Sequence, residues 1–334
     1  MTAATAPAAP AGPATPPGPA RRGPRPRGPV WTVLRLHRPA LLVWGAYVLG
    51  MAGWMLWLRI VTLDGVRRDS DSCARNGGCV DIESAMSYGT ALSTIGTLVS
   101  YLCYGVAAWA GAALIGRELE RGTAQLAWTQ SVTPTRWLTA KLALPAVALV
   151  LGTTVLVLLY RSAWAADRSI LGDEWYYPDP MVNRGPLLVA YALCALAVGA
   201  LAGLALKRAL PALAVSLGFM VWFHLWLDEL TPELWPATTL TGTAASRLPM
   251  TAEQLDLGAI TATGARVDDL TCFDADADID YTRCVSGKGF TDLYAEVHPE
   301  SHFWPLHLMT TGIVLAVALL ATTATFLLLR RRAR

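Results

Sequence analysis

The sequence is poor in charge and, among its cations, poor in lysine. Only 16% of its 334 residues are Asp, Glu, Lys or Arg, whereas 54% are apolar or aromatic. Soluble domains usually carry about 25% charged residues, so this composition argues against a water-soluble globule. The 27 cations, three of them lysines, nearly balance 25 anions and leave a formal net charge of +2. No basic surface for nucleic acid is indicated.

Several catalytic signatures are also missing. The sequence contains no G-x-x-x-x-G-K-[ST] loop, no H-E-x-x-H and no G-x-S-x-G, so we expect neither ATP cleavage by a P-loop nor a cofactor in this chain. Ionisable residues are missing from the centres of its long apolar stretches, which argues against an ion-driven carrier and an intramembrane enzyme. The nearest are His224 and Asp228, which we interpret as a pair at the membrane surface.

What the sequence does contain is six long apolar stretches. Each has about 18 to 26 residues, enough for a helix to cross a hydrocarbon core of roughly 30 Å. They lie at about 39–60, 91–116, 142–160, 186–206, 209–227 and 304–329. We therefore predict an all-α integral membrane protein with six transmembrane helices.

Two of these stretches carry further information. Residues 186–227 are apolar except for Lys207 and Arg208, which are soon followed by Pro211. Cations at such a midpoint predict a tight turn at a water interface and hence a helical hairpin. The second stretch is diluted by Gly, Ser and Thr, which suits a helix packed against other helices.

The distribution of Lys and Arg predicts the orientation. Sixteen lie beside the spans on the side of the two termini, against seven on the other side when the long loop before the last span is left out. We therefore expect both termini in the cytoplasm. The predicted parts are a disordered Pro/Ala/Arg-rich tail (1–29), an amphipathic approach and helices one to five (30–227), an extracytoplasmic loop or cap (228–303), and the sixth helix with a basic tail (304–334).

The outward segments hold four of the six cysteines. An even number in an oxidising compartment indicates two disulfides, and we favour Cys73 with Cys79 and Cys272 with Cys284, while the other pairings stay open. A metal site is the alternative, but the spacings match no common zinc pattern. His298, His302 and His307 also leave a metal site incomplete. Within the cap, a helix is expected at 251–257.

The inner side carries one substantial loop, residues 116–141, between the second and third stretches. It contains Glu118-x-Glu120-x-Gly122-Thr123 and then a Ser-Val-Thr-Pro-Thr-Arg136 turn. Leucines and arginines at helical spacing predict a short amphipathic helix against the membrane. Anchoring alone is one interpretation of this helix, and docking of a soluble partner is the other.

This loop resembles the permease subunits of bacterial ABC-2 type transporters. Members of that family have an acidic pair and Gly-Thr after the second helix, a T-x-P/S-x-S-R turn and then the third helix, and the six-span layout is similar. The resemblance is specific over about 116–142. The loop before the last span is longer than the short helical hairpin common in that family.

The resemblance implies a multi-pass protein of a bacterial plasma membrane that exports a substrate with ATP hydrolysed by a separate ATPase subunit. It implies that a second permease copy pairs with this one, surrounded by membrane lipid. The loop would be the coupling helix, with Glu118 and Glu120 as docking contacts, Gly122 at the bend, and Thr123 and Arg136 in the motif. The alternative from another class is a membrane sensor or accessory protein whose cap binds a ligand or a protein.

Overall fold

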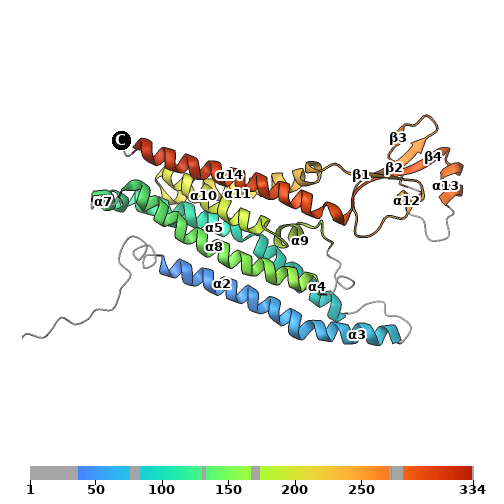
Figure 1. Ribbon diagram of the computed structural model, residues 1–334, viewed down its shortest axis with the longest axis horizontal. Coiled ribbons are helices and arrows are strands. Elements are labelled where there is room, and N and C mark those ends of the chain that lie inside the picture. Colours follow the sequence, from blue (N-terminus) through green and yellow to red (C-terminus); the bar gives the residue numbers. More distant parts are fainter. Residues whose placement is uncertain are drawn as a thin grey trace, which may run out of the picture.

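A long helical bundle with a small sheet domain at one end makes up the computed structural model (Figure 1), which describes residues 37–75, 83–129, 133–166, 174–270, 272 and 281–332. Six of its helical stretches are long and apolar enough to cross a membrane, which confirms the six-span prediction. They cover Arg38–Asp69, Glu83–Glu120, Pro134–Trp164, Leu187–Leu206, Ala209–Leu234 and Glu300–Arg332.

The first span is a peripheral helix that runs past its apolar part. Pro39 stands in its first turn, where the missing N–H costs no hydrogen bond. The helix passes through a π-helical turn and continues as a polar helix beyond the apolar stretch. Its parts are α2 (Arg38–Trp57), η1 (Leu58–Thr62) and α3 (Leu63–Arg75).

The second span is broken and tightly packed. Its parts are α4 (Glu83–Ser100), α5 (Leu102–Trp109), the π-helix η2 (Ala110–Gly116) and α6 (Arg117–Glu120). It packs against a central helix whose glycines allow close approach. A Cβ added at Gly199 would lie 2.7 Å from the Ala107 carbonyl oxygen, and one added at Gly203 would lie 2.9 Å from that of Gly111. The Gly, Ser and Thr residues of the second apolar stretch predicted such close packing against other helices.

The remaining spans are long helices, of which the last follows the cap. The hairpin expected at Lys207 and Arg208 is present. Helix α10 ends at Leu206, Lys207 adopts a left-handed conformation with φ of 55°, and α11 begins at Ala209. The parts are α8 (Pro134–Trp164), α9 (Pro178–Asn183), α10 (Leu187–Leu206), α11 (Ala209–Leu230), η3 (Thr231–Leu234) and α14 (Phe303–Arg332).

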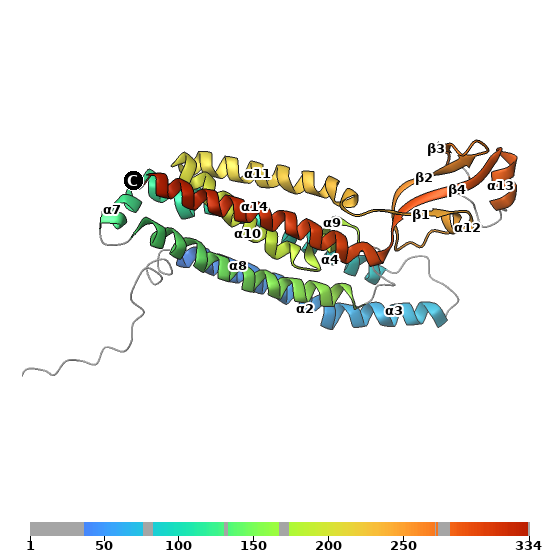
Figure 2. The ribbon, with the colours of Figure 1, turned by 45° about the horizontal axis from the view of Figure 1, so that its top comes forward.

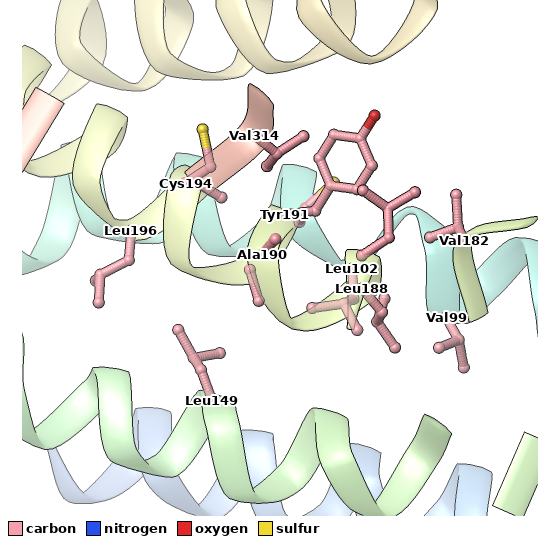
Figure 3. Packing of buried hydrophobic residues seen from close by; sticks show 14 of the residues in the cluster. Val99, Leu102, Leu149, Val182, Leu188, Ala190, Tyr191, Cys194, Leu196 and Val314 are labelled. Carbon is pink, nitrogen blue, oxygen red and sulfur yellow. The ribbon is translucent and has the colours of Figure 1, made fainter. Parts of the chain in front are cut away.

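Helix α10 forms the centre of the bundle. Most of its side chains are buried, whereas α2 and α11 lie on opposite sides and expose large apolar residues (Figure 2). Leu149 of α8 points toward α10, where Ala190 and Leu196 lie, and Tyr191 and Val314 pack nearby (Figure 3). The apolar surface left on the outer helices suits contact with lipid.

The cap is a sheet domain, so the all-α prediction is wrong for this part of the chain. Four antiparallel strands pair in the order β1-β4-β2-β3. The elements are β1 (Thr238–Thr241), α12 (Thr243–Ser246), β2 (Glu253–Thr261), β3 (Arg266–Val267), α13 (Tyr281–Gly287), β4 (Phe290–His298) and η4 (Glu300–His302).

The helix expected at 251–257 is instead the start of strand β2. Alternate residues of β4, Leu293, Ala295 and Val297, are buried, and Ala259 of β2 pairs with Leu293. The pairing of the two strands satisfies their backbone groups, and these side chains form an apolar core within the cap. Pairing between residues about 30 to 45 positions apart therefore decides the local structure.

A disulfide joins Cys272 and Cys284 in the cap, as expected. The other expected bond, between Cys73 and Cys79, lies outside the described residues. Cys103 and Cys194, in the spans, are buried free thiols. The described residues thus contain one of the two expected disulfides, the one within the cap.

Candidate functional site

The loop between the second and third spans forms a helical elbow at the end of the bundle opposite the cap (Figures 1 and 2). It consists of α6, a turn at Gly122 and α7 (Thr123–Thr129). Gly122 has φ of 71°, a left-handed conformation that side chains disfavour. Its N–H donates to the Leu119 carbonyl at 3.2 Å, and the Thr123 hydroxyl donates to the Glu118 carbonyl at 3.2 Å. The Gly-Thr pair therefore ends α6 and redirects the chain.

The second half of the motif begins α8. Thr133 is the N-cap, its hydroxyl accepts from the backbone N–H of Arg136 at 3.4 Å, and Pro134 occupies the first helical position. This arrangement explains the Thr-Pro pair as a helix start. It does not explain the exposed side chain of Arg136, because a cation near a helix N-terminus opposes the helix dipole.

Glu118 contacts a buried lysine. The Lys141 ammonium lies 2.5 Å from Glu118 Oε1 and also donates to the Leu114 carbonyl at 3.1 Å. Lys141 is only 2% exposed and Glu118 is 15% exposed. Charges removed from water require partners of this kind, so the pair links α6 to α8.

His37, just before α2, completes this cluster. Its Nε2 lies 3.3 Å from Lys141 Nζ and accepts from that ammonium. Burial, and then the positive charge of Lys141, lower the pKa of His37 to about 4, so the ring is neutral and can accept. Trp109 packs edge-on against His37 at 5.8 Å, and Trp137 lies 5.4 Å from Lys141 Nζ. The cluster thereby joins the first three spans.

Glu120 contacts a different part of the bundle. Its Oε2 accepts from the backbone N–H of Ala209 at 2.9 Å, at the start of α11. A carboxylate at a helix N-terminus satisfies a free N–H and complements the helix dipole. Gly116 lets the two segments meet, because a Cβ there would lie 3.1 Å from the Ala209 Cα. Glu120 therefore attaches the elbow to the α10–α11 turn.

The elbow presents positive charge outward. The exposed side chains of the elbow and of the start of α8 include three arginines and several neutral polar residues. Glu118 is largely buried against Lys141, whereas Glu120 is exposed, although its Oε2 accepts from the Ala209 N–H. Trp128 packs edge-on against Trp137 at 5.7 Å, and its indole N–H finds no hydrogen-bond partner among the described residues. The exposed cations are Arg117, Arg121 and Arg136.

The histidines singled out in the sequence do not converge on a metal site in the part of the chain that the structure describes. His298 and His302 face each other with their Nδ1 atoms 2.9 Å apart, while His307 lies elsewhere with its Nδ1 2.9 Å from the Met181 carbonyl. No group of three metal-ligating side chains converges within the described residues. His224 Nδ1 lies 3.1 Å from the Tyr104 hydroxyl, and its ring stacks on Tyr191. These histidines contact neighbouring helices instead.

Sequence reasoning missed one polar cluster. Helix α9 lies in a segment that was expected to be an outward loop, and it packs against α4. Asp179 of α9 accepts hydrogen bonds from the hydroxyls of Thr97 at 2.8 Å and Ser100 at 3.3 Å, both in α4. Asn183 Nδ2 donates to the Gly96 carbonyl at 2.9 Å. Small polar residues in the second stretch were the available signal, but their partner lies about 80 residues away along the chain.

Comparison with known proteins identifies a family for most of the spanning part of the chain. The sequence model of the family described as ABC-2 membrane transporter related matches residues 45–231, which include the elbow and most of the first five spans. Searches of curated proteins and of solved structures each found no match. The match covers more than half of the 334 residues. This multi-pass membrane protein therefore belongs to the ABC-2 membrane transporter related family.

Proposed function

We propose that this chain is the permease subunit of an exporter that moves its substrate with ATP hydrolysed by a separate ATPase subunit. Two copies of the chain would pair around the path. The excess of Lys and Arg on the elbow side supports a cytoplasmic elbow and cytoplasmic termini. The elbow and the last residues of α14 lie at the same end of the bundle, away from the cap (Figure 1).

One observation carries this proposal: the elbow is attached to the bundle by a separate carboxylate on each side. Glu118 links it to Lys141 of α8, and Glu120 links it to Ala209 of α11. A displacement of the elbow would therefore move several spans together rather than bend a loose loop. Such an attachment is what transmission of force from an ATPase requires.

Within this proposal, the motif residues have different roles. Glu118 and Glu120 act as positioning residues, because their carboxylates face partners within this chain. Gly122 and Thr123 set the angle of the elbow. The exposed Arg136, together with the exposed Arg121, contacts acidic groups of the ATPase.

Co-purification tests the proposal. The ATPase subunit encoded with this permease should be retained by the wild-type chain in detergent and lost from the double variant Arg121→Glu, Arg136→Glu. The matched control reverses two other exposed arginines on the same side, Arg330→Glu and Arg331→Glu, and should retain the partner. Retention by the elbow variant would refute the docking surface, and substrate transport by the chain alone would refute the need for an ATPase.

A further inference from the structure

An apolar hollow of about 580 Å³ lies within the spanning part of the bundle, between α2, α5 and α8. It is lined by aromatic and aliphatic side chains and by one glycine of α5, Gly105. A Cβ added at Gly105 would meet no atom within 4 Å, so the space beside this glycine is open. Pockets of several hundred cubic ångströms are large enough to bury a ligand.

Helix α2 contacts its neighbours beside the hollow through two large aromatic side chains. The Trp44 indole N–H donates to the Ala148 carbonyl at 3.0 Å, and its ring lies against Gly152, where a Cβ would come within 2.5 Å. The Tyr47 hydroxyl donates to the Leu98 carbonyl at 2.9 Å. These contacts tie α2 to α8 and α4, while neither Gly105 of α5 nor Ala148 of α8 has a side chain long enough to fill the space between the helices.

The chemistry of the lining favours an apolar ligand. The polar side-chain groups of Trp44 and Tyr47 already have hydrogen-bond partners, and among the other lining side chains the indole N–H of Trp109 is the one polar group. An unfilled space of this size forfeits the dispersion contacts that stabilise a protein interior. The occupant must therefore be apolar.

The position of the hollow indicates where this occupant comes from. Val43, which lines the hollow, is 71% exposed, whereas Leu102 on the opposite wall is 9% exposed. The hollow thus opens from the bilayer-facing surface of α2 toward the interior of the bundle. In the bilayer around α2, the apolar groups available to enter the hollow are the acyl chains of lipid.

We propose that the hollow binds one acyl chain of a bilayer phospholipid, which enters past α2 and ends against α5. The site is also adjacent to the elbow, because Trp109 of the hollow packs edge-on against His37, which contacts Lys141. The binding site itself does not depend on the proposed transport function.

Photolabelling of the full chain tests this site. The protein is placed in vesicles of phosphatidylcholine and phosphatidylglycerol that contain phosphatidylcholine with a diazirine on its acyl chain, and labelled peptides are identified by mass spectrometry. Surface lipid reaches exposed side chains such as Leu42, whereas buried Leu102 is accessible only to a chain inside the hollow. Label on residues 102–109 is therefore the expected signature.

Substitutions of the lining provide the comparison. Gly105→Leu should lower labelling of residues 102–109 by about tenfold, because its side chain displaces several methylene groups of the bound chain. Gly218→Leu is the matched control, since a Cβ there also meets nothing within 4 Å but lies in α11. If Gly105→Leu does not fold, Ala148→Leu fills the hollow from the opposite wall.

The outcomes separate clearly. Label on 102–109 that is lost in the filled variant and kept in Gly218→Leu supports the site. Label confined to exposed residues of α2, or label on 102–109 that persists in a folded Gly105→Leu or Ala148→Leu protein, overturns it. A second copy covering the hollow would also overturn it, and would appear as labelling of 102–109 in the monomer and none in the dimer.

Discussion

The ammonium of Lys141 and the carboxylate of Glu118 lie 2.5 Å apart although 23 residues separate them in the chain. The pair brings the end of the second span against the third and leaves no net charge in a largely buried place. Because His37 accepts from the same ammonium, the start of the first span is fixed at that point too. Three helices thus meet at one charged group next to the elbow.

Removing one partner of this pair should destabilise the protein strongly. Glu118→Gln leaves the Lys141 ammonium buried without its counter-charge, and loss of one member of a buried ion pair costs about 3 kcal/mol or more. A lower thermal unfolding temperature in detergent is the measurement. The double variant Glu118→Gln, Lys141→Met removes both charges and should recover most of the loss. If the loss of stability in the double variant equalled the sum of the losses in the two single variants, Glu118 and Lys141 would not interact.

Glu120→Ala should loosen the start of α11. The substitution removes the acceptor for the Ala209 N–H, and loss of a helix-capping group costs roughly 0.5–2 kcal/mol. Hydrogen exchange of the amides at the beginning of α11 should become faster, while amides in the middle of α11 stay unchanged. Glu120→Gln keeps an oxygen acceptor and serves as the control; equal exchange rates for wild type and Glu120→Ala would show that this bond contributes nothing.

The spans could be predicted from the sequence, because bilayer thickness makes the length of an apolar stretch informative by itself. The α10–α11 hairpin was equally accessible, since Lys207 and Arg208 interrupt an otherwise apolar stretch. Strand β2 was not, because its hydrogen bonds are made with β4, some 30 residues later. A local pattern cannot reveal a partner of that kind.

The elbow, too, could be predicted from the sequence only in part. The motif located the elbow, and Gly122 forms the bend that was expected of it. The partners of Glu118 and Glu120 could not be predicted, because Lys141 and Ala209 reach them only through the packing of α8 and α11. Glu118, which looks available for docking in the sequence, is therefore largely buried against its own chain, and Glu120, although exposed, accepts from the Ala209 N–H.

Gly122→Ala should impose strain at the elbow without any steric clash. A Cβ at this position meets nothing within 4 Å, so the whole cost arises from φ of 71° and amounts to about 1 kcal/mol. We expect a small fall in unfolding temperature and weaker retention of the ATPase. Gly218→Ala, in a helix and also facing open space, should not lower either quantity. Unchanged stability and retention in Gly122→Ala would mean that the bend tolerates another conformation.

The cap should become less stable as the pH rises toward 7. Glu253 begins β2 opposite His298, and burial, followed by the negative charge of Asp228, raises the pKa of its carboxyl to about 7 from the ordinary 4.5. Between these two values the folded cap binds a proton that the unfolded chain releases. Stability is therefore greatest below this window, falls as the pH rises through it, and stays lowest above about pH 7.

Hydrogen exchange of the β2 and β4 amides, corrected for the intrinsic effect of pH, measures this dependence. Opening should be more frequent at pH 8 than at pH 6 in the wild type. In Glu253→Gln, which has no carboxyl to ionise, the difference should largely disappear. The control Asp268→Asn removes an exposed carboxylate of the same cap and should keep the wild-type dependence. If Glu253→Gln retained the full difference, the proton would have to reside on another group, because Glu253 could then not be the residue whose ionisation weakens the strand pair.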